Sequence, residues 1–233
     1  VPDTIMYNMS DAVDHCRRIT RMADISLMVD GEDGFGNAVN TMRTVRELEA
    51  AGVSAIEIED NIAPMQFNAG ALGLHSQTEQ VGKLEAAVAA RNDLTTIIVS
   101  RTAALSDLPL DEALDRIKAY AQTGVEAVRL VGLRSREQLE AVHQATSLPL
   151  TVLSLPEDMM NDRDFLAANG MRILMLGNPA YAMTVKAIYD CFKHLKDGGA
   201  MADLSGKEAS AELLRSVNRT DELLQLQQQY LRS

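Results

Sequence analysis

The sequence predicts an α/β fold, a (β/α)8 TIM-type barrel followed by C-terminal helices, from two observations. Short β-branched runs alternate with helical patterns, and acidic or basic residues stand at the ends of several runs. Alternating strands and helices form parallel sheets, and barrels place their functional residues at the carboxyl ends of the strands. The alternation alone also allows an open doubly wound sheet, but the strand-end acids favour the barrel. The six predicted strands are residues 25–30, 55–60, 96–101, 127–132, 150–154 and 172–177.

Composition narrows the class of protein. The chain has 233 residues, 46% of them hydrophobic, and a net charge of −11. Nucleic acids and anionic membranes attract positive surfaces, so neither is expected as a partner. No apolar run is long enough to span a bilayer, and Cys16 and Cys191 lie far apart without the spacing of a disulfide or zinc site. These features are typical of a cytoplasmic enzyme.

Helix boundaries between the strands are marked by capping residues and glycines. Residues 39–48 carry apolar side chains on one helical face, and Gly52 ends that helix. Residues 114–121 repeat the pattern and end at Gly124. Ser135 begins a third helix, with Gln138 completing a predicted capping box. A buried strand follows each of the two glycines, which supports the strand–helix repeat.

The chain changes character after the sixth strand. A long helix is predicted over Tyr181–Lys196, broken by Gly198-Gly199, and two Leu- and Gln-rich helices are predicted over 205–217 and 220–231. We expect residues 1–233 to form one barrel domain, with 181–233 as a helical extension that serves oligomerisation.

Acidic residues cluster at the ends of the first two strands. Asp30 and Glu32 follow the first strand, and Glu59 ends the second. Carboxylates at adjacent strand ends can hold Mg²⁺ directly or through its waters. Acids at strand ends also cap the following helices, and spacing alone leaves the two interpretations equal. Asp33 and Asp60 are predicted to be caps rather than ligands.

Three further residues at strand ends could contact a substrate. Gly34 lies in a turn that weakly resembles a phosphate cradle, although a tight turn explains it better. Arg101 ends the third strand and suits bidentate carboxylate binding, with a surface salt bridge as the alternative. Asn178 could donate a hydrogen bond to a substrate oxygen or simply form a turn before Pro179. The later histidines, including His75, are predicted to be peripheral.

Together these motifs resemble the isocitrate lyase / phosphoenolpyruvate mutase superfamily. The resemblance lies in residues 29–37, 43–53 and 58–60, continues at Arg101-Thr102 and 130–132, and extends to about residue 195. It is strongest to the oxaloacetate decarboxylase-like branch of that superfamily.

The resemblance implies a (β/α)8 barrel that uses Mg²⁺, with Mn²⁺ possible, to stabilise an enolate formed from a keto or hydroxy acid. Asp30 would be the direct metal ligand, and Glu32 and Glu59 would hold metal-bound waters. Arg101 and Asn178 would bind substrate and serve catalysis, with Gly34 as a further substrate-binding position. The superfamily also implies a homotetramer built from dimers that exchange the last barrel helix.

The sequence departs from the superfamily pattern in several places. Glu32 stands where the family has Asp, and residues 64–69 replace the cysteine-containing loop of the lyase branch. Asn178 stands where the decarboxylase branch has His. The first predicted strand resembles the family's third, so the first β/α unit and the second strand would precede Val1.

These observations predict a Mg²⁺-dependent decarboxylase of a small α-keto dicarboxylate such as oxaloacetate. The alternatives are a carbon–carbon lyase, a phosphonopyruvate or phosphoenolpyruvate enzyme of the same superfamily, or a keto-acid-binding relative without turnover.

Overall fold

A computed structural model describes residues 6–64 and 73–231 of the chain. These residues divide into two compact units, 1–177 and 178–233, and each unit is described by itself.

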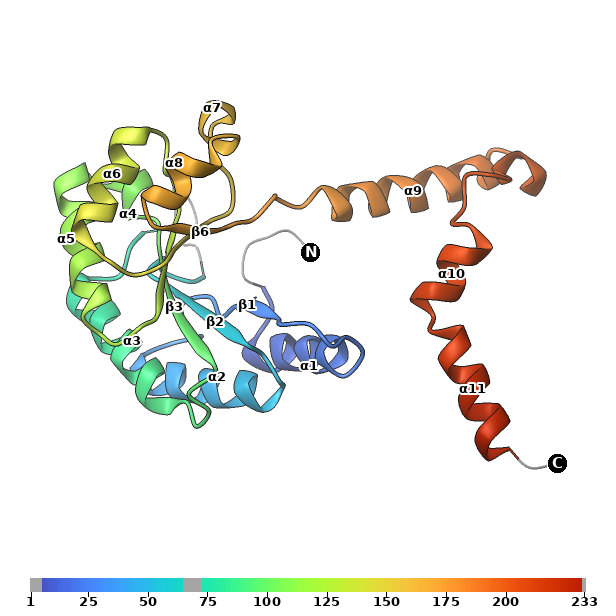
Figure 1. Cartoon of the computed structure of the whole chain (residues 1–233), viewed down its shortest axis with the longest axis horizontal. Helices are drawn as coiled ribbons and strands as arrows, with labels where there is room; N and C mark the ends of the chain where they lie inside the picture. The colour runs from blue at the N-terminus through green and yellow to red at the C-terminus, as the bar shows by residue number, and fades with distance from the viewer. Residues whose placement is uncertain (1–5, 65–72, 232–233) are drawn as a thin grey trace. The chain divides into compact units, whose positions relative to one another are not determined.

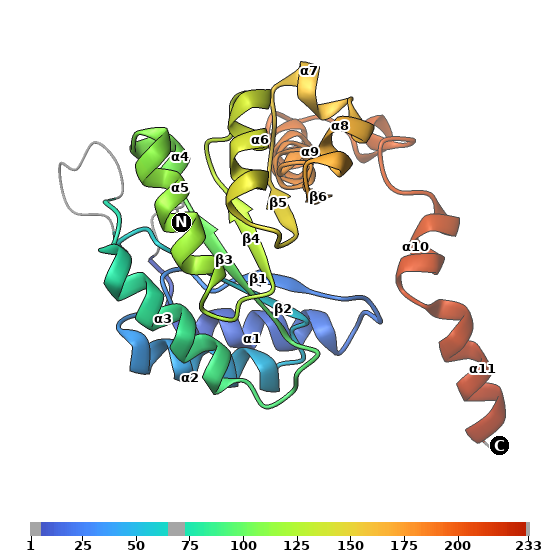
Figure 2. The same cartoon turned by 60° about the vertical axis from the view of Figure 1, so that its left-hand side comes forward.

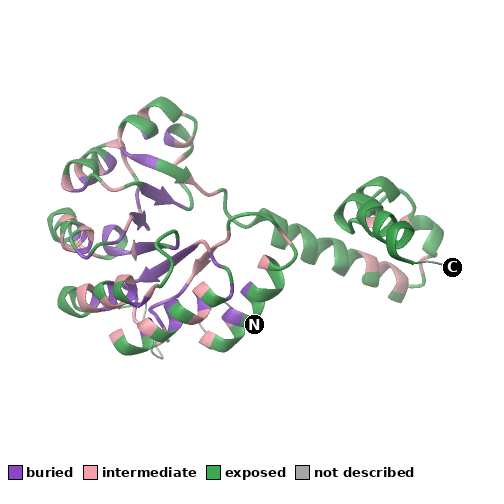
Figure 3. Cartoon of the chain, turned by 60° about the horizontal axis from the view of Figure 1, so that its bottom comes forward, coloured by how far each residue is buried: buried purple, intermediate pink, exposed green. Residues whose placement is uncertain are grey.

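The first unit contains a parallel sheet of six strands that follow one another in chain order, β1 to β6. The sheet curves into a half-barrel, with helices on its outer side (Figures 1 and 3). The predicted α/β barrel-type fold is therefore confirmed. The strands are β1 Met28–Asp30, β2 Ala55–Glu59, β3 Ile97–Thr102, β4 Ala127–Leu130, β5 Leu150–Val152 and β6 Met171–Leu174.

Within the described residues of this unit, eight helices connect or flank the strands (Figure 2). Gly52 and Gly124 adopt φ values of 84° and 92° after their helices, as predicted for C-terminal glycines. Ser135 caps α6 by accepting a hydrogen bond from the Gln138 amide. The predicted reciprocal half of that capping box is wrong, because the Gln138 side chain accepts from the Arg134 amide instead. The helices are α1 Met9–Thr20, α2 Ala38–Ala50, α3 Gln77–Ala90, α4 Ala104–Asp107, α5 Leu110–Ala121, α6 Arg136–Ala145, α7 Glu157–Met160 and α8 Arg163–Ala168.

The core lies between the outer helices and the sheet. Leu48 of α2, Leu84 of α3 and Ile56 of β2 are fully buried in one cluster. Ile117, Leu139 and Leu150 belong to a second cluster around β4 to β6. Burial of such a side chain stabilises the fold by about 1.5–3 kcal/mol, so the strands form a firm base for the side chains at their ends.

The second unit is helical. It contains α9 Pro179–Lys196, the short 3₁₀ helix η1 Met201–Leu204, α10 Ala211–Val217 and α11 Thr220–Tyr230. The predicted start of the second helix at residue 205 is wrong. Gly206 has a φ of 80°, and Ser210 caps α10 by accepting from the Leu213 amide. Among the residues that the structure describes, no helix has the length and apolarity needed to cross a membrane.

Candidate active site

The acidic turn after β1 lies along the end of β2. The Gly31 amide donates to the Glu57 carbonyl at 2.8 Å, and the Glu59 amide donates to the Glu32 carbonyl at 2.8 Å. Asp30 Oδ1 accepts from the Glu32 amide at 3.0 Å. Glu32 has a φ of 52°, a conformation that a residue with a side chain adopts only when its surroundings enforce it. These bonds hold Asp30, Glu32 and Glu59 at one edge of the sheet.

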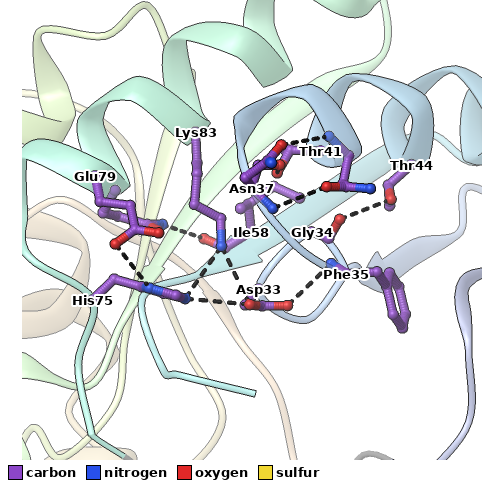
Figure 4. Close-up of polar contacts among 12 residues, drawn as sticks. Asp33, Gly34, Phe35, Asn37, Thr41, Thr44, Ile58, His75, Glu79 and Lys83 are labelled. Carbon is purple, nitrogen blue, oxygen red and sulfur yellow. Dashed lines mark hydrogen bonds and ion pairs between the residues drawn. The ribbon is translucent and has the colours of Figure 1, made fainter. Parts of the chain in front are cut away.

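Gly34 is required by the shape of this turn (Figure 4). Its φ is 83°, and a Cβ placed there would lie 2.2 Å from the Thr41 Oγ1 atom. The Thr44 hydroxyl donates to the Gly34 carbonyl at 3.0 Å and ties the turn to α2. The tight-turn interpretation therefore explains this glycine, and its contact with a substrate stays a prediction.

Arg101 connects the acids of the two neighbouring strands. Its guanidinium forms a short ion pair with Asp30 through Nη1, and its Nη2 lies 3.2 Å from Glu59 Oε2. Ile98 of β3 packs in the cluster with the outer helices, so Val99 and Arg101 alternate to the opposite, concave face of the curved sheet. The structure thus brings together three of the predicted site residues. Arg101 forms salt bridges with both acids, one of them the partly exposed Asp30, and its binding of a substrate carboxylate stays a prediction.

The electrostatics of this cluster are dominated by burial and by crowded carboxylates. Burial raises the pKa of Glu59 to about 8; Arg101 opposes the shift, whereas Asp30 and Glu32 add to it. Burial also raises the pKa of Glu57, although Arg129 hydrogen-bonds to it. Burial and the neighbouring carboxylates therefore favour the protonated form of Glu59 near neutral pH, and a bound cation would instead favour its ionised form.

The donor set fits a magnesium ion. The cluster contains four carboxylates and two guanidinium groups, so full ionisation would leave an excess of two negative charges. These groups are Asp30, Glu32, Glu57 and Glu59, with Arg101 and Arg129. Carboxylate oxygens are the ligands that Mg²⁺ prefers. Among the described residues, no three carboxylate, histidine or cysteine groups converge as a ready metal cage. Such a cage is not required, because Mg²⁺ is commonly bound by one or two carboxylates and keeps several waters. Asp30, Glu32 and Glu59 would hold it.

Glu32 also contacts a residue that sequence reasoning did not identify. The Tyr7 hydroxyl donates to Glu32 Oε1 in a short hydrogen bond. The Tyr7 ring packs edge-on against Phe35, with the ring centroids 5.8 Å apart. Tyr7, which precedes α1, thus stabilises the acidic turn. No local sequence pattern indicates this long-range contact.

A buried polar network lies behind the turn (Figure 4). Lys83 of α3 is fully buried, and its Nζ lies 3.3 Å from Asp33 Oδ2 and 3.2 Å from His75 Nε2. His75 Nε2 in turn lies 3.2 Å from the same Asp33 oxygen. Asp33 was predicted to cap a helix and His75 to be peripheral, and both predictions are wrong. Asn37 caps α2 instead, which leaves Asp33 to pair with α3.

Asp60 also differs from its predicted role as a helix cap. Its carboxylate accepts from the Thr102 hydroxyl at 2.7 Å, the Ala103 amide at 3.0 Å and the Tyr120 hydroxyl at 3.1 Å. Burial raises the pKa of Asp60, and these donors oppose the shift. The residue joins the ends of β2 and β3 rather than beginning α3, which Ser76 caps.

Asn178 and the loop 64–69 carry the two remaining predictions. Asn178 belongs to the second unit, where it precedes α9 and makes no side-chain capping bond. Its catalytic role stays a prediction. Of the predicted decarboxylase-type loop 64–69, residues 65–69 lie outside the described residues.

A parallel half-barrel with carboxylates and an arginine clustered at its strand ends is the architecture of a TIM-barrel enzyme. The model of the phosphoenolpyruvate phosphomutase family matches residues 1–196. The chain belongs to this family, in agreement with the superfamily that its motifs resemble.

Curated relatives include oxaloacetate decarboxylases. That of Rhodopseudomonas palustris strain BisA53 is 38% identical over 220 residues, covering 94% of this chain and 75% of the relative. That of Bradyrhizobium sp. strain BTAi1 is 38% identical over 230 residues, covering 99% and 79%. These relatives confirm the predicted enzyme class, a carbon–carbon lyase of the oxaloacetate decarboxylase type.

Solved structures with similar folds come from the same superfamily. Phosphonopyruvate hydrolase in complex with oxalate and Mg²⁺ has a TM-score of 0.85 and 28% identity, covering all of this chain and 82% of the other. Phosphoenolpyruvate phosphomutase from Streptomyces platensis subsp. rosaceus has a TM-score of 0.85 and 26% identity, covering 100% and 83%.

Proposed function

We propose that this chain is a Mg²⁺-dependent decarboxylase of a small α-keto dicarboxylate such as oxaloacetate. The observation that carries the proposal is the Asp30–Arg101–Glu59 cluster at the ends of three neighbouring strands. The name of the curated relatives supports the reaction, and a superfamily structure with oxalate and Mg²⁺ supports the cofactor.

Some residues of the cluster would bind the metal ion, and Arg101 would bind the substrate. Bound Mg²⁺ would supply the positive charge that favours enolate formation. Asp30, Glu32 and Glu59 would hold and orient that ion. Arg101 presents a planar guanidinium suited to a substrate carboxylate. Its position beside Asp30 and Glu59 would orient the keto acid for bond cleavage, and orientation alone can supply a large share of the rate.

Gly34 and Asn178 complete the proposed substrate contacts. The turn at Gly34 presents backbone close to the acids, and Asn178 would donate a hydrogen bond to a substrate oxygen. An asparagine does not titrate, so Asn178 would orient the substrate rather than transfer a proton.

Phosphonopyruvate chemistry is the second candidate. The structural similarity to phosphonopyruvate hydrolase favours it, since that enzyme shares the fold at a TM-score of 0.85. A phosphonate and a carboxylate are both anions that an arginine binds, so substrate turnover must distinguish them.

The test measures loss of oxaloacetate and of phosphonopyruvate by the purified protein, with and without Mg²⁺. We expect Mg²⁺-dependent loss of oxaloacetate, with kcat/KM at least about 100-fold lower in Asp30→Ala, because a metal supplies several kcal/mol. Asp111→Ala, an exposed acid of α5, is the matched control and should keep its rate. Turnover of phosphonopyruvate alone, or equal loss of oxaloacetate in both variants, would refute the proposal.

A further inference from the structure

A row of polar side chains crosses the curved sheet near the carboxyl ends of its strands. Glu59, Arg101, Arg129 and Thr151 are register partners on the successive strands β2, β3, β4 and β5. Three buried atoms of this row have no hydrogen-bond partner within the described part of the chain: Arg101 Nε, Arg129 Nε and Thr151 Oγ1. Buried polar atoms are nearly always satisfied, so an unsatisfied set at a strand-end cluster points to a polar ligand.

Arg129 faces the same space as Arg101. Its Nη1 donates to Glu57 Oε1 at 2.7 Å and to Glu57 Oε2 at 2.6 Å. This contact reaches from β4 past β3 to β2, just as Arg101 reaches from β3 past β2 to β1. Two neighbouring guanidinium groups therefore stand on the concave face, each backed by a carboxylate.

The pairing with Glu57 leaves one edge of the Arg129 guanidinium available. Both bonds to Glu57 use Nη1, so the edge formed by Nε and Nη2 makes no hydrogen bond to any described residue. Two parallel N–H groups on one edge are the arrangement that binds a carboxylate in a bidentate manner. Arg129 keeps about a tenth of its side chain exposed, whereas Glu57 behind it is 1% exposed.

We propose that this free edge of Arg129 binds the second carboxylate of a dicarboxylate substrate, while Arg101 binds the first. The inference rests on the proposed decarboxylase function and assigns the residue that would recognise the distal carboxylate of its substrate. A keto acid with one carboxylate would leave the Arg129 edge unpaired, which is costly in a buried site. Arg129 therefore selects dicarboxylates.

Glu57 explains how a carboxylate can be bound here and still depart. During decarboxylation the bond between the distal carboxylate and the carbon skeleton breaks. Its electron pair passes to the skeleton as an enolate, which later takes up one proton, and the carboxylate leaves as neutral CO₂. A lone arginine would stabilise the carboxylate charge that this step removes. Because Glu57 offsets that positive charge, Arg129 orients the group with less resistance to its loss.

The test compares two ligands that differ in the distal group, with Mg²⁺ present and binding measured by calorimetry. The inhibitor 3,3-difluorooxaloacetate carries both carboxylates of oxaloacetate. Oxalate reproduces only the α-keto acid end, its second carboxylate standing in for the keto group, and lacks the distal carboxylate that Arg129 would bind. The variant pair Glu57→Gln with Arg129→Gln removes both charges together and so avoids an unpaired buried ion. We expect it to weaken difluorooxaloacetate at least about tenfold, a value typical of a charged hydrogen bond, and oxalate less than about threefold.

The single variant Glu57→Gln should change the affinity for difluorooxaloacetate in the opposite direction. It leaves Arg129 without its neutralising partner, so difluorooxaloacetate should bind more tightly and oxaloacetate turnover should slow. Equal weakening of both ligands, or no change in either, would overturn the assignment and leave Arg129 a structural residue. Failure of the wild-type protein to consume oxaloacetate, with the ligand discrimination intact, would instead refute only the proposed reaction.

Discussion

Lys83 shows how this fold holds a charge with no exposure to water. Its ammonium lies between Asp33 and His75 behind the acidic turn, and all three side chains are largely buried. A buried charge is tolerated only when partners replace the lost hydration. The network also ties α3 to the turn that carries Asp30 and Glu32. Its integrity therefore bears on both stability and the geometry of the acids.

Replacing Lys83 should lower the free energy of unfolding, because it leaves the buried Asp33 carboxylate without its ion-pair partner. Lys83→Met is expected to lower the free energy of unfolding by about 3–5 kcal/mol, the range for breaking one side of a buried ion pair. Urea unfolding measures this change. The double variant Lys83→Met with Asp33→Asn should recover a large part of the loss. If the two single effects simply add in the double variant, Lys83 and Asp33 do not act as a pair.

Among single residues, the sequence predicts best those that stand at the carboxyl ends of strands. Asp30, Glu59 and Arg101 end adjacent parallel strands, so they meet at one edge of the sheet. His75 and Tyr7 could not be placed in the same way, because their contacts join segments distant in the chain. Arg129 carried a weak signal, a charge inside the buried strand β4, which indicates an inward-facing partner.

The turn between β1 and α2 is the element on which the site depends. It reverses the chain within a few residues, and Gly34 occupies a left-handed conformation against the first turn of α2. An added side chain there meets both backbone strain and a steric clash with Thr41. Gly34 therefore does not tolerate a side chain, whereas Gly82 within α3 has room for one.

Gly34→Ala should therefore destabilise the protein by about 2–4 kcal/mol, from the left-handed conformation and from overpacking. Gly82→Ala is the matched control, because nothing lies within 4 Å of its added Cβ and it stands inside a helix. That control should be neutral or stabilising by up to about 1 kcal/mol. Thermal unfolding compares the two, and equal melting temperatures would contradict the structural account of the turn.

Glu49 of α2 holds the connection between α3 and β3. It accepts bonds from the amides of Asn92 and Asp93 and from the Asn92 side chain. Burial raises the pKa of Glu49, but these hydrogen bonds outweigh it and lower the pKa below the ordinary 4.5. A lowered pKa in the folded state adds stability above pH 4.5, which is lost as the pH falls through the folded-state pKa.

Glu49→Gln should reduce stability by roughly 1 kcal/mol at pH 7, a value discounted for partial exposure. The difference from wild type should shrink as the pH falls below 4.5. Urea unfolding at several pH values measures it. A difference that grows on acidification would show that the sign of the Glu49 contribution is wrong.

Over the whole molecule, the two units differ in how they bury apolar residues. Each of the six strands and eight helices of the first unit except β1 contributes buried residues, whereas α9, α10 and α11 contribute none. Ile188 and Phe192 of α9 are 54% and 68% exposed. Large exposed apolar surfaces mark contacts between proteins. The surface of α9 agrees with the homo-oligomer that the resemblance implies, which stays a prediction.

The mass in solution tests this expectation. Sedimentation of the wild-type protein should give a multiple of the 25.4 kDa chain, with a tetramer expected. Ile188→Asp combined with Phe192→Asp should shift the mass towards a single chain, because buried charges oppose association. Thr184→Asp, on an exposed position of the same helix, serves as the control. A wild-type monomer, or a variant that keeps its mass, would refute a role of α9 in assembly.

The alternation of strands and helices was predictable across the molecule because each element carries its own periodicity and capping residues. The first and last residues of the elements were less predictable. The shift of α10 from residue 205 to Ala211 came from Gly206 and the Ser210 cap, whose local geometry overrides an apolar pattern.

The proposed reaction depends on a magnesium ion bound by the carboxylates at the strand ends. The most direct measurement strips the protein with a chelator and returns Mg²⁺ stepwise, while calorimetry counts bound ions and oxaloacetate loss is followed. We predict one ion per chain and a rate that rises with its occupancy, with both lost in Asp30→Ala. Full activity in the stripped protein, or metal binding unchanged in Asp30→Ala, would contradict the claim.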